Sequence, residues 1–292
     1  MENKQVKNHG LSLTLEKEHQ KPTDWIFGAT SVPCIAQIPQ NRRLDYLPKG
    51  EVQRGAEDVM DCASRGPVNI LEAKFTFLVK SKRLSEQNEK WLYDNGYVQN
   101  GVVTFSDAYV AINSHTTPQG NSMIAPLEAI HKQGLTPKKM LPLEPWMRWS
   151  DYHKPSRITQ SMVALGLKFL SRFTINYERV LEKDFESAYE QDMIDMAGFA
   201  WPEPIDGEYP RTDNDPNHVF VGIHLPKHNI FDNYQEAPGD FIKKLAPDYD
   251  LLDYGYRLII GETKNPETPT KQSLITNLKN LLCKTICAGR SG

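Results

Sequence analysis

Three residues in this chain have the chemistry of a nucleophile, a base and an orienting group. Cys62 precedes apolar residues at helical spacing, so its thiol is predicted at a helix N-terminus. A helix N-terminus and a nearby imidazolium lower the pKa of a thiol, so Cys62 should react fastest of the cysteines. His218 begins a predicted strand and Asp232 ends the next one. A third polar group of this kind can fix the ring and tautomer of a histidine. The sequence therefore predicts a site made of Cys62, His218 and Asp232.

Helices are predicted mainly in the first half of the chain and strands mainly in the second. Helical patterns follow Cys62 up to Lys80 and recur at 106–113, 122–133, 157–165 and 181–193. Strands are predicted at 198–201, 219–223, 229–231 and 255–260. Pro67 lies where the first helical turns should be, so we expect the regular helix to begin two or three residues after Cys62.

Composition divides the chain into a central domain with a segment on each side. Residues 1–23 are polar and predict a flexible N-terminal arm, and residues 24–262 form the predicted domain. Within it, the proline-rich stretch 137–157 separates a helical half at about 56–145 from a β-rich half at about 157–262.

The remaining segment and the overall composition bear on partners and location. Residues 263–292 predict a linker and a C-terminal helix whose apolar face favours docking on another protein. A net charge of -3 with 39% hydrophobic residues gives no sign of a nucleic-acid surface. We find neither a secretory signal nor the roughly 18 apolar residues of a membrane span, so a soluble cytoplasmic protein is expected. Four cysteines in 292 residues are too few for a disulfide framework.

The order of short motifs resembles the papain-like cysteine peptidases. In that family the nucleophile opens a long helix that contains a Leu-Glu pair, and Cys62 with Leu71-Glu72 follows the same plan. The other similar motifs, in chain order, are Phe105-Ser106-Asp107, Pro118-Gln119-Gly120-Asn121-Ser122, Asn217-His218-Val219-Phe220-Val221-Gly222, Ile230-Phe231-Asp232-Asn233-Tyr234 and Gly255-Tyr256-Arg257. Together they cover about residues 30–262. Several of them look most like a divergent papain-like group associated with bacteriophage genomes.

This resemblance implies an α+β, papain-like fold: a helical left subdomain, an antiparallel β-rich right subdomain, and the active site in the cleft between them. It implies peptide hydrolysis through a thioester by a Cys-His-Asp triad, a peptide or protein substrate and no cofactor. A phage protein would reside in the host cytoplasm or the virion, where its C-terminal helix could contact phage structural proteins. The alternative is a non-catalytic papain-fold structural or interaction protein, such as a virion component.

The chain departs from the family pattern near the nucleophile. Papains carry an oxyanion-hole glutamine six residues before the cysteine, where this chain has Ala56. Gln53, nine residues before Cys62, can serve only if the intervening loop is longer by three residues. By the same resemblance, Gly120 and Asn121 offer backbone hydrogen bonds to an extended substrate. Because only 61 residues precede Cys62, inhibition by a long propeptide is not expected.

Other interpretations of these residues were weighed. A lone cysteine at the start of an apolar helix is more often a small buried residue, and only the ordered motifs favour a nucleophile. His218, His224 and His228 could ligate a metal, but no H-E-x-x-H helix or suitably spaced carboxylate accompanies them, so no metal is predicted. Trp201 is expected either to pack in the core or to lie near the cleft.

Overall fold

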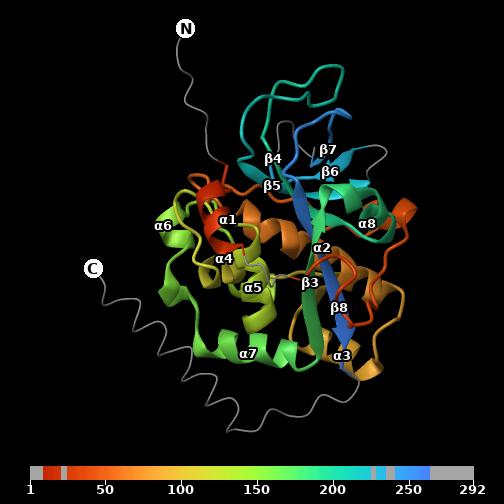
Figure 1. Cartoon of the computed structure of the whole chain (residues 1–292). Coiled ribbons are helices and arrows are strands. Elements are labelled where there is room, and N and C mark those ends of the chain that lie inside the picture. Colours follow the sequence, from red (N-terminus) through yellow and green to blue (C-terminus); the bar gives the residue numbers. More distant parts are fainter. Residues whose placement is uncertain (1–8, 21–24, 225–227, 235–240, 264–292) are drawn as a thin grey trace.

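The computed structural model describes residues 9–20, 25–224, 228–234 and 241–263. It has a helical half and a sheet that meet around one central helix (Figure 1). The predicted C-terminal helix and its linker lie outside the described residues, apart from residue 263. The helices are α1 (Leu13–His19), α2 (Cys62–Lys80), α3 (Glu86–Asp94), α4 (Asp107–Asn113), α5 (Ile124–Gln133), α6 (Trp149–Tyr152), α7 (Gln160–Leu170) and α8 (Phe185–Gln191). No helix in the described part of the chain is long and apolar enough to cross a membrane.

The strands form a six-stranded antiparallel sheet and a separate two-stranded hairpin. The hairpin consists of β1 (Val98–Gln99) and β2 (Val102–Val103). In the large sheet the order is β3-β8-β4-β5-β6-β7. Its strands are β3 (Phe173–Leu181), β4 (Ile194–Gly198), β5 (His218–His224), β6 (Asn229–Phe231), β7 (Ile242–Lys244) and β8 (Tyr254–Glu262).

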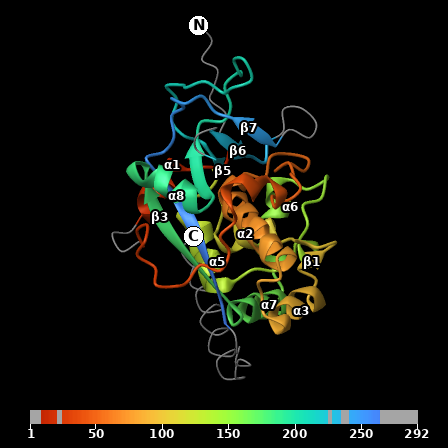
Figure 2. The same cartoon turned by 90° about the vertical axis from the view of Figure 1, so that its right-hand side faces the viewer.

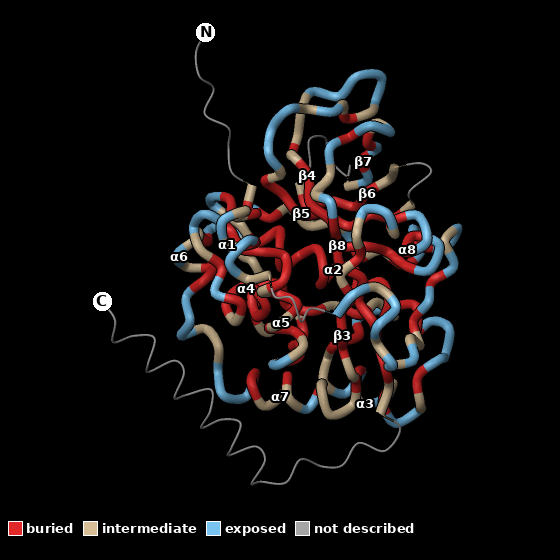
Figure 3. Tube along the Cα trace, in the orientation of Figure 1, coloured by how far each residue is buried: buried red, intermediate tan, exposed pale blue. Residues whose placement is uncertain are grey.

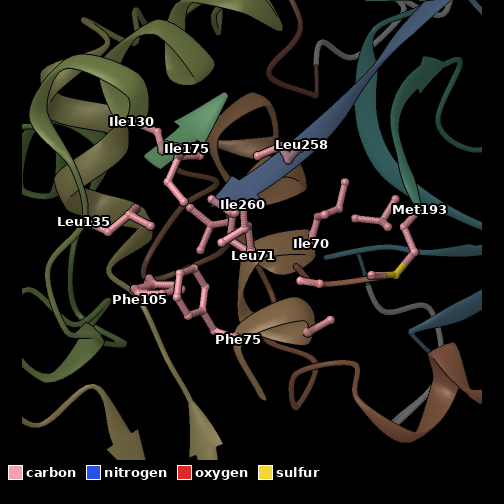
Figure 4. Close-up of a cluster of buried hydrophobic side chains, with 14 of the residues drawn as sticks. Ile70, Leu71, Phe75, Phe105, Ile130, Leu135, Ile175, Met193, Leu258 and Ile260 are labelled. Atoms are coloured by element: carbon pink, nitrogen blue, oxygen red, sulfur yellow. The ribbon is translucent and has the colours of Figure 1, made fainter. Parts of the chain in front are cut away.

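Helix α2 packs between the other helices and the sheet (Figure 2). Every residue of α2 except the last is buried, including the charged residues Arg65, Glu72 and Lys74. Figure 4 shows Ile70, Leu71 and Phe75 of α2 among apolar side chains from both layers. The buried residues follow α2 and the central strands, while exposed residues follow the outer loops (Figure 3). The core therefore holds the two halves together through a single helix.

The first turn of α2 is regular, contrary to the expectation based on Pro67. The Asp61 carbonyl accepts hydrogen bonds from the Ser64 and Arg65 N–H groups, at 2.8 and 3.0 Å. The Arg65 guanidinium also donates to the Asp61 carboxylate at 2.7 Å, and both side chains are buried. These bonds fix the turn before Pro67 is reached, so the helix begins at Cys62.

Two of the sequence motifs contact each other directly. The Glu72 carboxylate accepts the Phe105 N–H at 2.7 Å, and burial raises the pKa of Glu72 to about 8. Ser106 then caps α4, because its hydroxyl accepts the Tyr109 N–H at 3.1 Å. The helix predicted at 106–113 is therefore confirmed, and the hydrogen bond from Phe105 to Glu72 holds its start against α2.

Several predicted elements shift along the chain. The strand predicted at 198–201 lies at Ile194–Gly198, and the helix predicted at 181–193 is shortened to Phe185–Gln191. Strand β3 was not predicted. Its nine residues pair in register with β8, from Phe173 opposite Glu262 to Leu181 opposite Tyr254. β3 forms because it pairs with a distant segment, and the periodicity of its own residues does not predict that pairing.

Residues 9–20 of the predicted N-terminal arm pack against the domain, and we call them the strap. Leu11 is buried in the main core, and the Ser12 hydroxyl accepts the Leu15 N–H at the start of α1. Glu16 is also buried, although Lys17 and Glu18, which follow it in α1, are exposed. The strap is held by a few buried polar contacts, which its polar composition gave no reason to expect.

The approach of α2 to the sheet depends on Gly66. A methyl group at this position would lie 1.9 Å from Asp195 Oδ1 and 3.0 Å from Val219 Cγ1. Gly66→Ala should therefore lower the free energy of unfolding by about 1–3 kcal/mol through overpacking. Gly66→Ala combined with Asp195→Ala should recover most of this loss, because the clashing carboxyl is gone. Urea denaturation of the four proteins measures the coupling.

Asp195→Ala alone provides the control. Neither Asp195 oxygen has a hydrogen-bond partner among the described residues, and burial raises the pKa of this carboxyl. A raised pKa in the folded state favours folding below the unfolded pKa of about 3.9 and penalises it as the pH rises. The stability of Asp195→Ala relative to wild type should therefore increase as the pH rises above about 4. A pH-independent difference would contradict the assigned burial of the carboxyl.

Candidate active site

Two of the three predicted site residues form a buried pair at the end of the sheet. His218 is the first residue of β5, and Asp232 directly follows β6, which pairs with β5. The His218 Nε2 and Asp232 Oδ1 atoms are 2.6 Å apart, and both side chains are fully buried. This contact holds the imidazole ring and leaves Nδ1 facing away from the carboxylate.

Cys62 lies beside this pair, at the N-terminus of α2. The N–H of Val219, the residue after His218, lies close enough to the Cys62 sulfur to lower the pKa of the thiol. Helix α2 packs against β5, so a single contact between a helix start and a strand start places the thiol next to the histidine. The structure thus brings Cys62, His218 and Asp232 to one place.

Asp232 is held by two further groups that the sequence did not single out for this purpose. The Trp201 indole N–H donates to Asp232 Oδ2 at 2.8 Å, and the Lys243 ammonium lies 2.9 Å from the same oxygen. Lys243 is the buried middle residue of β7, whose two other residues face outward. Burial alone would raise the pKa of Asp232, but His218 and Lys243 outweigh it and lower the pKa. The only sign of Lys243 in the sequence was an alternating pattern of residues around it, and this pattern is too short to predict a buried lysine.

Gln53, the candidate oxyanion donor, lies next to the histidine. Its amide nitrogen is 3.2 Å from the His9 carbonyl oxygen and 2.8 Å from the Tyr234 hydroxyl. The Tyr234 ring packs 4.8 Å from the His218 ring, and its hydroxyl donates to Asp58. The longer loop between Gln53 and Cys62 therefore brings this amide into the site.

The strap covers these residues. A methyl group at Gly10 would lie 3.0 Å from the Cys62 sulfur and 2.9 Å from the Met60 carbonyl, and Gly10 has a φ of +106°. The His9 carbonyl, which accepts from Gln53, also lies 3.3 Å from His218 Nδ1. At this position of the strap only a glycine fits against the thiol, so Gly10 allows the strap to cover the site.

Gly120 and Asn121, predicted to bind a substrate backbone, contact the strap backbone. The Asn121 N–H donates to the Gly10 carbonyl and its own carbonyl accepts from the Ser12 N–H, both at 2.9 Å. This bridge between Leu11 and Asn121 is parallel. A side chain at Gly120 would collide with the Gly10 carbonyl. The strap thus uses the hydrogen bonds that this loop was expected to offer to a substrate.

The covered thiol differs from the reactive thiol that the sequence predicted. Burial raises the pKa of Cys62, the Val219 N–H lowers it, and the carboxylates of Asp61 and Asp58 raise it further. A raised pKa lowers the fraction of thiolate, and the strap covers the sulfur, so this closed state is predicted to react slowly. The expectation of a depressed pKa is wrong for this state, because the sequence did not show that the strap covers the sulfur.

The described residues contain no group of three or more histidine, cysteine or acidic side chains that could hold a metal. His218 is paired with Asp232, and the other two histidines weighed as ligands lie at the bulged end of the β5–β6 hairpin. Cys283 and Cys287 lie outside the described residues.

The fold is similar to solved cysteine proteases. Xylellain, a cysteine protease from Xylella fastidiosa, has a TM-score of 0.51 and 11% identity over 89% of this chain and 97% of its own. The Amb a 11 cysteine protease of ragweed pollen, in its proform, has a TM-score of 0.52 and 12% identity over 89% of this chain and 78% of its own. No protein-family profile and no curated protein matches the sequence. The predicted α+β, papain-like fold is therefore confirmed.

The pairing of Asp232 with Lys243 can be measured by a double-mutant cycle. Lys243→Met and Asp232→Asn should each lower the free energy of unfolding by about 3 kcal/mol, because each removes one partner of a buried ion pair. The combined variant should recover most of this loss, since an amide still accepts from His218 and no unpaired charge is left. Lys244→Met, at the exposed neighbouring position, should have little effect. Additive losses would show that the two residues are not coupled.

The closed strap predicts how Cys62 reacts with iodoacetamide. In the wild-type chain, half-buried Cys34 should be labelled faster than buried Cys62. Gly10→Ala should speed the labelling of Cys62 by roughly tenfold or more, because a left-handed alanine costs about 1–3 kcal/mol and its methyl group meets the site. Gly101→Ala is the matched control, since Gly101 also has a positive φ but open space around it. Equal rates in both variants, measured by mass spectrometry, would mean that the strap does not protect the thiol.

Proposed function

We propose that this protein is a cysteine peptidase whose catalytic residues are Cys62, His218 and Asp232. The observation that carries the proposal is the fixed His218–Asp232 pair, with the Cys62 sulfur beside the residue that follows the histidine. The confirmed fold supports it, because the solved structures of that fold named above are cysteine proteases. Identities of 11–12% do not carry the activity over, so the proposal rests on the geometry of this site.

The reaction begins when the strap leaves the site. His218 Nδ1 takes the proton of the Cys62 thiol, and the thiolate attacks a peptide carbonyl carbon. The Gln53 amide and the Cys62 N–H stabilise the negative oxygen that forms. His218 returns the proton to the amine nitrogen as the C–N bond breaks, which leaves a thioester on Cys62.

The second half of the reaction releases the acid. Water attacks the thioester carbonyl while His218 takes its proton, and the C–S bond breaks to restore the thiol. Asp232 keeps the imidazole in the orientation that serves both steps. Lys243 and Trp201 hold Asp232 in place, so we assign them positioning roles.

The proposal is tested in the full-length chain with a loosened strap. Gly10→Ala should hydrolyse peptides from a broad library, and Gly10→Ala/Cys62→Ser should be slower by a factor on the order of 10⁴ or more. The added serine should leave the unfolding transition nearly unchanged, because it changes the side-chain volume little. Product formation is followed by mass spectrometry.

Absence of turnover in Gly10→Ala, together with no covalent trapping by a thiol-directed peptide electrophile, would reject the peptidase. That result would support the alternative, a papain-fold protein that binds or assembles without catalysis. Full burial of the thiol is the observation that favours this alternative.

A further inference from the structure

Glu16 is a buried carboxylate that the proposed reaction does not use. It belongs to α1 of the strap, and its exposed fraction is 2%. Charged side chains are seldom buried unless they are paired or hydrogen-bonded. The groups that receive Glu16 therefore form a site of their own, which we call the Glu16 socket.

The socket contains two donors that converge on the two oxygens of one carboxylate. The Met123 N–H donates to Glu16 Oε2 at 2.6 Å, and the Tyr254 hydroxyl donates to Oε1 at 2.7 Å. Met123 is fully buried and Tyr254 is 3% exposed. The donors come from separate parts of the fold outside the strap, namely the start of α5 and strand β8. The Gln20 side chain of the strap also donates to the Tyr254 hydroxyl, at 2.5 Å.

The charge around the socket favours an anion. Burial raises the pKa of Glu16, while the hydrogen bonds from Tyr254 and Met123 and the charge of Arg179 act in the opposite direction. The Arg179 guanidinium, which does not belong to the strap, lies 4.2 Å from the centre of the Tyr254 ring. The nearby Asp195 opposes an anion only when it is charged. Burial raises the pKa of Asp195, which favours its uncharged form. A carboxylate is therefore a better ligand for the two donors than an apolar side chain.

The socket adjoins the cleft of the proposed peptidase. Met123 follows Asn121 by two residues, and Asn121 holds the strap backbone at Gly10, over the Cys62 sulfur. The strap thus occupies the cleft with its backbone and the socket with one side chain. A peptide that replaces the strap would leave two buried donors without an acceptor, unless it supplies one.

We propose that the Glu16 socket is a specificity site that receives a glutamate side chain of the peptide substrate when the strap is released. This inference rests on the proposed function and adds a substrate class to it. Aspartate is one methylene shorter and should bind less well. Glutamine offers one neutral oxygen and should also be weaker than glutamate, because charge-assisted hydrogen bonds are stronger.

The test measures binding, so it does not depend on turnover. The full-length variant Gly10→Ala/Glu16→Ala/Cys62→Ala has a loosened strap, an empty socket and no nucleophile. Fluorescent peptides of one length carry glutamate, glutamine or leucine at each position in turn, and fluorescence anisotropy gives Kd. At one position, glutamate should bind about tenfold more tightly than leucine. Equal Kd values at every position would overturn the socket as a specificity site and leave it as a tether for the strap.

Two substitutions in the same background assign the preference to the two donors. Met123→Pro removes the N–H while keeping a compatible backbone, since Met123 has a φ of -65°. Tyr254→Phe removes only the hydroxyl. Each should reduce the preference for glutamate several-fold. Met123→Leu keeps the N–H, and Tyr97→Phe removes a distant buried hydroxyl that binds the Leu135 carbonyl, so neither control should change the preference. A preference that survives both donor substitutions would place glutamate elsewhere.

The outcome separates this inference from the proposed function. With Cys62 restored, hydrolysis without any preference for glutamate would reject the socket and keep the peptidase. Tight binding of glutamate peptides without hydrolysis would reject the peptidase and keep the socket as a recognition site.

Discussion

The contact between the first turns of α2 and strand β5 is the constraint on which the site depends. Gly66 allows the helix to approach the sheet near Val219, whose N–H lies close enough to the Cys62 sulfur to lower the pKa of the thiol. Because His218 and Val219 are consecutive, the packing of α2 on this part of the strand also sets the position of the histidine relative to Cys62. The two halves of the molecule carry different members of the site, and this contact keeps their separation fixed. Close packing of interiors makes such a position sensitive to a single methyl group.

Buried charges near the site occur in compensated groups. Asp232 is paired with Lys243, so the group that orients the histidine carries little net charge. Next to the nucleophile, Asp61 raises the pKa of the thiol, but its carboxylate is bound by Arg65 and by the Tyr152 hydroxyl at 2.6 Å. Compensation of this kind limits how far each acidic group disfavours a thiolate once the sulfur is uncovered. It also explains why buried lysine and arginine side chains lie near a site in which none of them is a nucleophile or a base.

Ordered motifs predicted the parts of the structure that local sequence controls. The start of α4 at Ser106 and the neighbouring positions of His218 and Asp232 follow from caps, alternation and motif order. The strap at His9 and Gly10 was missed because backbone hydrogen bonds hold much of it, and a polar composition does not report these. Lys243 was missed because its burial depends on Asp232, a partner that only the folded sheet supplies. Gln53 was predicted only in part. Its residue type indicated an oxyanion donor, but whether it reached the site depended on the length of the loop between Gln53 and Cys62.

The strap is bonded to both halves of the molecule. Its backbone pairs with Asn121 in the helical half and donates from Leu11 to the Asn217 carbonyl on the β-rich side, while Glu16 joins Met123 to Tyr254. It therefore acts as a non-covalent cross-link across the cleft, and its attachment to the same chain gives it a high effective concentration there. Opening the cleft breaks this cross-link at the same moment as it frees the thiol. The open form should accordingly be the less stable one, so that exposure of the site and resistance to heat or proteolysis cannot both be maximal in this chain.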